Sequence, residues 1–259
     1  MQITQVRNAT QILSYGGKKF LIDPMLADKE AYPGFGSTIR SEIRIPTVEL
    51  PFDLDVILDV DAVILTHTHP DHWDEEAVQA VPKDKLIFVQ NKHDEEIVRS
   101  QGFVNLKCLN ETKEYAGISI KTTACQHGYD ALYANEPMAE FLGEVTGVIF
   151  EHADEEKLYI VGDTIWIPAV EETMKKEQPG VVILNTGWAH VLEFGPIIMG
   201  KEDVYKTHIA LPKAKIVATH MEAVNHTLLT RKELREYVEV NQFSEFVYIP
   251  EDGETVDFN

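Results

Sequence analysis

The chain has 259 residues, of which 44% are hydrophobic and 25% charged, a composition that fits a soluble globular protein and excludes extensive disorder. Its 43 acidic residues outnumber its 23 basic residues and give a formal net charge of −20. A field of this sign repels polyanions, and no Lys/Arg cluster interrupts it, so we expect no nucleic-acid binding.

The N-terminal part of the chain has the pattern of a hairpin followed by an irregular segment. Residues 9–15 and 18–23 have strand composition, and Gly16-Gly17 between them supplies the turn. Pro24 then ends the ladder, because proline has no N–H to donate. Residues 28–55 hold several prolines and glycines and little periodicity, which predicts a long surface segment that borders a site.

From residue 61 onward, apolar strands alternate with helices. Residues 61–66 form a short, nearly all-apolar run, typical of a strand buried on both faces. Residues 145–152 and 158–162 are expected to pair across the turn at 153–156. The other predicted strands are 86–90, 104–109, 117–124, 181–184, 215–219 and 246–249, the last leading into a polar tail. The predicted helices are 74–81, 92–101, 168–177, 201–210 and 230–240.

Neither a linker nor a targeting segment stands out. No shift in composition divides the chain, so we expect one mixed α/β domain over residues 1–259. The first eight residues lack the basic start and apolar run of a signal peptide, and no apolar stretch approaches the roughly 18 residues of a membrane span. Cys108 and Cys125 fit reduced thiols better than a disulfide. We expect a cytoplasmic protein without membrane partners, and the sequence leaves open whether it forms a homo-oligomer.

Three histidines and an aspartate fall within the six residues that follow the strand 61–66. In extended backbone the side chains of His67 and His69 project to the same side. A proline then turns the chain, so that Asp71 and His72 open the next element. Imidazole and carboxylate groups are good ligands for zinc, iron or manganese. Two ligands from the strand end and two from the turn can serve two metal ions side by side.

Six residues cannot complete two metal sites, so further ligands must come from other strand ends. His127, Asp163 and His220 each follow an apolar strand, as His67 does. A local similarity supports this arrangement: the strand before Asp23 and the strand before Asp163 are both hydrophobic and both lead to an aspartate. The pattern hints at two halves that each deliver an acid at a strand end.

The chain resembles the metallo-β-lactamase fold superfamily. The resemblance rests on the His-x-His-x-Asp-His motif, on the strand-end acids, and on the order in which a His, an Asp and a His follow the motif. The resemblance covers essentially the full length and is greatest to the bacterial branch of metal-dependent hydrolases that includes the ascorbate-phosphate lactonase. It implies the four-layer αββα sandwich of that superfamily, with two β-sheets face to face and helices outside.

The resemblance also implies two divalent metal ions and a role for each residue. It assigns one ion to His67, His69 and His127 and the other to Asp71, His72 and His220, with Asp163 bridging both. Asp23 would hold a ligand histidine in position. Zinc is the expected metal, and His/Asp sites also accept manganese and iron.

Two metal ions that share a water lower its pKa and supply hydroxide near neutral pH. Asp71 is a candidate acceptor for the water proton. Polar stretches that follow the strand 181–184 and His220 place His190 and His226 on the predicted metal side, where either can donate to a substrate oxyanion. We therefore expect a metal-dependent hydrolase that acts on a small ester or lactone.

Three other functions stay open at this point. A phosphodiesterase would use the same site on a small molecule. An iron-dependent oxidoreductase fits less well, because the flavin-partnered di-iron type usually has Glu at the place of His69 and carries a flavodoxin domain. A metal-binding protein that has lost catalysis is the third, and the complete ligand set argues against it.

Overall fold

The first of two large sheets is built mainly from the N-terminal half of the chain. The computed structural model describes residues 1–258 and orders this sheet β16-β1-β2-β3-β4-β5-β6. Neighbours are antiparallel from β16 to β3 and parallel from β3 to β6. The strands are β1 (Gln2–Arg7), β2 (Thr10–Tyr15), β3 (Lys18–Ile22), β4 (Ala62–Ile64), β5 (Leu86–Val89), β6 (Leu106–Cys108) and β16 (Thr255–Asp257).

The second sheet repeats this mixture of antiparallel and parallel pairs. Its order is β15-β14-β11-β10-β9-β8-β7, antiparallel from β7 to β10 and parallel from β10 to β15. The strands are β7 (Glu114–Tyr115), β8 (Ile118–Ala124), β9 (Thr146–Glu151), β10 (Leu158–Ile160), β11 (Val181–Asn185), β14 (Lys215–Thr219) and β15 (Val247–Tyr248). In both sheets the parallel strands point their carboxyl ends to one edge of the molecule.

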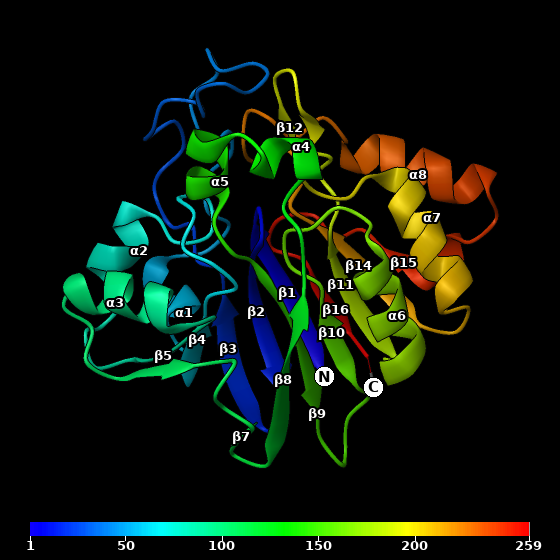
Figure 1. The fold of residues 1–259 in the computed structure, drawn as a ribbon. Coiled ribbons are helices and arrows are strands. Elements are labelled where there is room, and N and C mark those ends of the chain that lie inside the picture. The colour runs from blue at the N-terminus through cyan, green and yellow to red at the C-terminus, as the bar shows by residue number, and fades with distance from the viewer. Residues whose placement is uncertain (259) are drawn as a thin grey trace.

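Helices cover the outer faces of both sheets, which gives four layers (Figure 1). On the first sheet lie α1 (Leu54–Ile57), α2 (Glu75–Ala80) and α3 (Lys92–Ser100). On the second lie α6 (Pro168–Glu177), α7 (Lys201–Ala210) and α8 (Arg231–Val240), followed by the 3-10 turn η1 (Ser244–Phe246). The αββα sandwich is therefore confirmed. Within residues 1–258, no helix is both long enough and apolar enough to cross a bilayer.

Shorter elements lie beyond one end of the two sheets. They are α4 (Asp130–Tyr133), α5 (Glu136–Leu142) and the small hairpin of β12 (His190–Val191) and β13 (Gly195–Pro196). All of them sit at the edge toward which the parallel strands point (Figure 1). The connections that leave the strands at this edge are where a site in a layered α/β fold is usually built.

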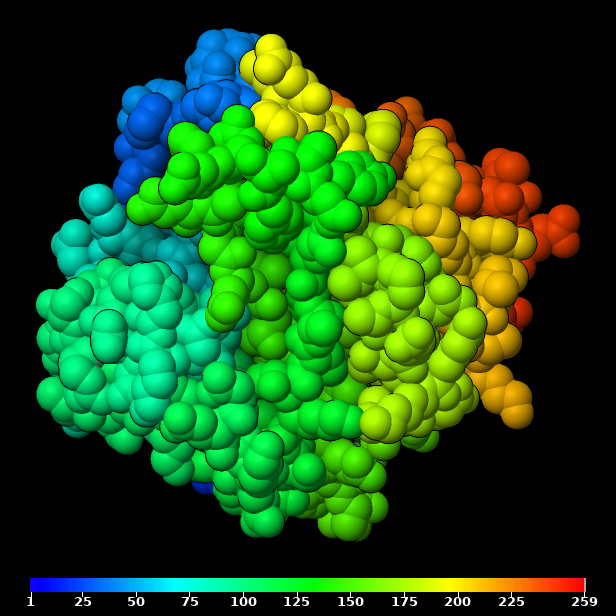
Figure 2. All heavy atoms as spheres, in the orientation of Figure 1, coloured from blue at the N-terminus to red at the C-terminus, as the bar shows by residue number. Residues whose placement is uncertain are grey.

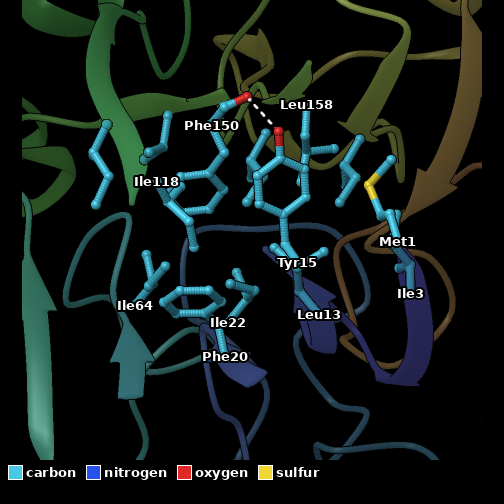
Figure 3. Close-up of a cluster of buried hydrophobic side chains, with 14 of the residues drawn as sticks. Met1, Ile3, Leu13, Tyr15, Phe20, Ile22, Ile64, Ile118, Phe150 and Leu158 are labelled. Carbon is cyan, nitrogen blue, oxygen red and sulfur yellow. Dashed lines mark hydrogen bonds between the residues drawn. The ribbon is translucent and has the colours of Figure 1, made fainter. Parts of the chain in front are cut away.

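The main core fills the space between the two sheets (Figure 3). Phe20 from the first sheet stacks on Phe150 from the second, with ring centroids 5.5 Å apart. The Tyr15 hydroxyl donates to the Phe150 carbonyl over 3.1 Å, so this buried phenol keeps a hydrogen bond. Each sheet thus contributes its inward-facing apolar side chains to one rigid layer, and the strand ends are held in fixed relation to each other.

Most of the predicted elements are present, and two hairpins match in detail. Strands β2 and β3 pair across Gly16 and Gly17, which both have positive φ (56° and 74°), and β9 pairs with β10 as expected. The prediction of a polar C-terminal tail is wrong in part, because Thr255–Asp257 pair with β1. Neither β1 nor β16 was expected. Strand β16 has only three residues, and one of them is buried. This alternation is too short to identify an edge strand from the sequence.

Candidate metal centre

All seven residues predicted as metal ligands converge at the edge where the parallel strands end. His67 follows β4, Asp163 follows β10 and His220 follows β14. His69 is half-buried and the other six are buried. The strand-end reasoning therefore placed side chains from positions 67 to 220 in one cluster.

Two strand-end residues have backbone in the left-handed region: Asp23 (φ 43°) and His220 (φ 61°). The His220 amide donates to the Asn8 carbonyl over 3.0 Å, which fixes this conformation against the first sheet. Gly187 packs against the same place, since a Cβ there would lie 2.0 Å from the His220 carbonyl oxygen. Strained backbone held by surrounding contacts is a common feature of functional sites.

Three histidines form the first donor group. His67 Nε2 lies 3.0 Å from His69 Nδ1. The His127 ring is 5.8 Å from the His67 ring and 5.3 Å from the His69 ring, measured between centroids. One nitrogen from each ring lies within 4.8 Å of the other two. Two chain segments, 67–69 and the one that carries His127, thus bring three donor atoms close together.

The second donor group holds Asp71, His72 and His220. His72 Nε2 is 3.1 Å from His220 Nε2, and His220 Nε2 is 3.3 Å from Asp71 Oδ2. Zinc–nitrogen bonds of about 2.0–2.1 Å at a tetrahedral angle separate two ligand atoms by about 3.3 Å. The separations in this group therefore fit a single cation among three donors.

Asp163 lies between the two groups. Its Oδ2 is 3.2 Å from His72 Nε2, 3.6 Å from both His127 Nε2 and His220 Nε2, and 4.0 Å from His67 Nε2. The other oxygen, Oδ1, accepts a hydrogen bond of 2.6 Å from the Asn185 side chain. One carboxylate oxygen thus faces donors of both groups, as a bridging ligand must.

Four of the five histidines have their outward nitrogen against a fixed oxygen. His72 Nδ1 is 3.0 Å from Asp23 Oδ2, and His127 Nδ1 is 2.9 Å from the Ile197 carbonyl. His69 Nε2 is 2.9 Å from the Phe141 carbonyl, and His67 Nδ1 is 3.1 Å from the Thr66 hydroxyl oxygen. A carboxylate or carbonyl can only accept, so the outward nitrogen carries the hydrogen. The inward nitrogen is then free for a cation, as in metal-bound histidine.

Thr66 fixes the position of the hydrogen on His67 through two linked hydrogen bonds. Its hydroxyl donates to Asp23 Oδ2 over 2.7 Å, so its oxygen is left to accept from His67. The Thr66 amide donates to Asp23 Oδ1 over 2.8 Å. Asp23 therefore orients histidines of both donor groups. Together with Asp163, it also places one strand-end carboxylate at each nitrogen of His72, one from each sheet.

The charges of the cluster favour the binding of a cation in the second donor group, which holds Asp71, His72 and His220. Burial raises the pKa of Asp71 and Asp163, but His72 and His220 outweigh burial and hold both pKa values well below the usual range. Burial lowers the pKa of His220, but Asp163 and Asp71 outweigh it and raise that pKa to about 9. The carboxylates thus stay ionised, and protons balance them when no metal is bound. Metal binding would displace those protons, so the donor set fits divalent zinc, manganese or iron.

A cavity of about 30 Å³ lies against the cluster. Four of the proposed ligands, His69, Asp71, His127 and Asp163, line it, and His226 lines it as well. The remaining lining is apolar except for one hydroxyl: Phe35, Thr38, Pro70, Phe141, Leu142, Val191 and Ile197. The irregular segment 28–55 therefore borders the site as predicted, through Phe35 and Thr38.

Of the two histidines predicted to contact substrate, the structure brings only His226 to the cavity. Its Nδ1 is buried and has no hydrogen-bond partner within residues 1–258, and burial lowers its pKa to about 4. His190 packs edge-on against Trp188, with ring centroids 4.5 Å apart, and does not line the cavity. The catalytic roles of Asp71, His190 and His226 stay predictions.

Residues 18–221 match the family described as "Beta-lactamase superfamily domain". The match includes the parallel strands β3 to β6, most of the second sheet and every residue of the donor cluster. The chain belongs to the beta-lactamase superfamily. Within it, the UPF0173 protein YddR of Bacillus subtilis is 44% identical over 259 residues, which is the full length of both chains. Proteins of Rubrobacter xylanophilus and Azorhizobium caulinodans that share 27% and 26% identity over parts of the chain are named UPF0173 metal-dependent hydrolases.

Two solved structures are very similar to this superfamily member. One is named the isothiocyanate hydrolase from Delia radicum gut bacteria; it is 50% identical, has a TM-score of 0.98, and the match covers 100% of this chain and 99% of that one. The other is a possible metal-dependent hydrolase from Veillonella parvula, 45% identical with a TM-score of 0.97, covering 99% and 98%. Both share the fold over essentially its whole length.

Sequence reasoning missed the residues that hold this superfamily site in shape. Thr66 and Asn185 each contact a donor residue, and both stand at a strand end, so the signal used for the ligands could have found them. The acceptors at Phe141 and Ile197 are backbone carbonyls, which no residue type reveals. The apolar lining of the cavity comes from short elements without periodicity, and only the fold brings them together.

Replacing Asp23 with Ala is expected to weaken metal binding in this superfamily member by about 10- to 100-fold, the usual effect of removing a ligand's hydrogen-bond partner. The substitution leaves His72 Nδ1 without its acceptor and breaks the Thr66 relay to His67. Titration of metal-free protein with zinc, followed by calorimetry, measures the change. Asp61→Ala, at an exposed turn next to β4, is the control, and equal affinities in the two variants would refute the positioning role.

Proposed function

We propose that this chain, a metal-dependent hydrolase by its family, hydrolyses small uncharged isothiocyanates, R–N=C=S, at a binuclear metal centre. The observation that carries the proposal is the cavity, whose lining combines four of the proposed metal ligands with apolar side chains. Among its described lining residues there is no Lys or Arg to pair with an anionic substrate. The 50% identity to a protein named isothiocyanate hydrolase supports this substrate class.

We assign the two ions as the donor groups suggest. His67, His69 and His127 would hold one ion, Asp71, His72 and His220 the other, and Asp163 would bind both. Three protein ligands and the shared carboxylate would give each ion four protein donors, so water or substrate would bind as a fifth ligand. When bound there, two divalent cations would lower the pKa of a water molecule and polarise the substrate.

Hydrolysis of an isothiocyanate has a simple balance: R–N=C=S and water give R–NH₂ and O=C=S. The water oxygen bonds to the central carbon, the carbon–nitrogen bond breaks, and both water protons end on nitrogen. A group beside the cavity must move at least one of these protons. His226 is neutral at pH 7, because burial lowers its pKa to about 4, and so offers both an N–H and a lone pair.

Asp71 is less suited to that role. His72 and His220 hold its pKa well below the usual range, which makes it a weak proton acceptor. Its Oδ2 lies 3.3 Å from His220 Nε2, within the second donor group. We therefore assign Asp71 to metal binding and His226 to proton transfer.

A small ester or lactone is the second candidate substrate. Its carbonyl carbon is open to the same attack by water, and the uncharged walls of the cavity accept it equally well. A phosphodiester fits less well, because its charge would lie against Phe35, Phe141 and Ile197 with no described cationic side chain to pair with it.

The test measures the products of zinc-loaded protein with three substrates: benzyl isothiocyanate, p-nitrophenyl acetate and bis(p-nitrophenyl) phosphate. We expect benzylamine and carbonyl sulfide in equal amounts, and a kcat/KM at least about 100-fold above that for the phosphate, because an unpaired charge is costly in an apolar cavity. Chelation should abolish turnover, and zinc or manganese should restore it. Ester turnover without benzylamine would favour the second candidate, and phosphate turnover above both would contradict an uncharged substrate.

A further inference from the structure

The cavity beside the donor cluster is too small for an organic substrate. Its volume of about 30 Å³ holds about two or three water molecules at roughly 10–15 Å³ each, while even methyl isothiocyanate has four heavy atoms. Part of the lining must therefore move before a substrate can enter. Two of its side chains, Phe141 and Leu142, come from α5.

We call residues 129–142 the cover. The segment contains α4 and α5, links β8 to β9, and lies across the end of the sheets (Figure 1). In the space-filling view its green atoms lie next to the blue atoms of the N-terminal segment and the yellow atoms near β12 (Figure 2). Gly128 and Gly143 flank it, both with positive φ (114° and 56°), and a Cβ on Gly143 would meet nothing within 4 Å. Gly143 thus lies in open space, in a backbone conformation that side chains rarely adopt, at the end of the cover.

The two lining residues of the cover differ in what they contact. Leu142 is 1% exposed and packs with Leu132 and Ile197 in a small apolar cluster, which anchors the closed position. Phe141 is 56% exposed and contributes nothing to that cluster. Its ring stacks on His69 instead, with centroids 5.5 Å apart and planes 15° from parallel. Its carbonyl accepts from His69 Nε2 over 2.9 Å.

A second aromatic ring also lines the cavity. Phe35, from the irregular segment, packs edge-on against His226 with centroids 5.0 Å apart. Each of the two rings thus lies against a histidine, Phe141 against His69 of the first donor group and Phe35 against His226. Of these two rings, Phe141 belongs to the cover and moves with it when the cover opens.

We propose that Phe141 is a specificity-determining residue: the cover opens to admit the substrate, and the Phe141 ring then packs against the group R. This inference deepens the proposed function and rests on it for the nature of R. It follows that the enzyme prefers aromatic over small aliphatic substrates. The preference arises from ring–ring contact, which stabilises a complex beyond simple area burial.

The test uses ligands that bind without being hydrolysed. Thiolates are good zinc ligands, so calorimetry can compare 2-phenylethanethiol with ethanethiol on the zinc-loaded protein. We expect the wild-type protein to bind the aromatic thiol at least about tenfold more tightly, and Phe141→Ala to reduce this preference to less than about threefold. Tyr129→Ala is the matched control, because Tyr129 is an aromatic residue of the cover that is 51% exposed and does not line the cavity.

An equal preference in wild-type protein and Phe141→Ala overturns the assignment, whether that preference is large or small. Hydrogen exchange tests the opening itself: amides of residues 130–142 should exchange more slowly when 2-phenylethanethiol saturates the protein, and unchanged exchange there refutes a moving cover. Absence of isothiocyanate turnover in the wild-type protein would count against the proposed function alone, because the thiol comparison does not depend on turnover.

Discussion

Replacing Asp163 with Ala is expected to remove both metal ions and reduce hydrolysis to background. Asp163 Oδ2 lies within 4.0 Å of a nitrogen on each of four histidines, and its charge balances the positive charge of the cluster. Loss of kcat/KM should exceed the about 10- to 100-fold caused by removing an outer hydrogen-bond partner. Metal content per chain by mass spectrometry, measured with turnover, checks both parts.

Two further variants serve as comparisons for Asp163→Ala. Asp154→Ala removes an exposed carboxylate in the turn between β9 and β10 and should retain both ions. Asn185→Ala removes only the hydrogen bond to Asp163 Oδ1 and should have an intermediate effect. An Asp163→Ala protein that still holds two ions per chain would show that this carboxylate does not bridge them.

Replacing Arg7 with Ala is expected to lower the free energy of unfolding by about 3 kcal/mol or more, because it leaves several buried carbonyl oxygens unsatisfied. Arg7 is fully buried and donates to Val48, Met25 and Ala27 carbonyls over 3.0, 2.6 and 2.8 Å. Burial lowers the pKa of Arg7 to about 10, and this value is still high enough for the side chain to be charged at neutral pH. Urea unfolding of the metal-free protein measures the change.

Arg44→Ala is the matched control for that prediction. Arg44 also donates to two backbone carbonyls, those of Glu30 and Ala31 in the irregular segment, both over 2.7 Å, but it lies at the surface. Water replaces those hydrogen bonds when the side chain is removed, so we expect a loss below about 1 kcal/mol. Equal losses in the two variants would mean that burial does not set the strength of these contacts. The segment matters for function because it carries Phe35 to the cavity.

Much of the fold could be predicted because buried strands differ from everything around them. The run before His67 is apolar on both faces, as a central parallel strand must be. The strands at the chain ends carry no such signal: β1 alternates only weakly, and the edge strand β16 buries only Val256 among its three residues. Both depend on pairing between the two ends of the chain, which local sequence does not encode.

The donor cluster could be predicted for a related reason. Parallel strands deliver their carboxyl ends to one edge, so polar residues that follow apolar strands, such as Asp163 and His220, meet there whatever their separation in sequence. The cavity could not be predicted in this way. Its apolar walls come from α5, the β12 hairpin and the irregular segment, whose places are set by tertiary contacts. The substrate class therefore stays a proposal that rests on the lining of this cavity.

A crystal structure of the metal-loaded protein, with anomalous data collected at the metal absorption edge, tests the central claim most directly. We predict two anomalous peaks about 3.5–4 Å apart, as in other two-metal sites. One should contact His67, His69 and His127 and the other Asp71, His72 and His220, with Asp163 in contact with both. A single peak at full occupancy, or two peaks that share no carboxylate, would contradict the binuclear centre.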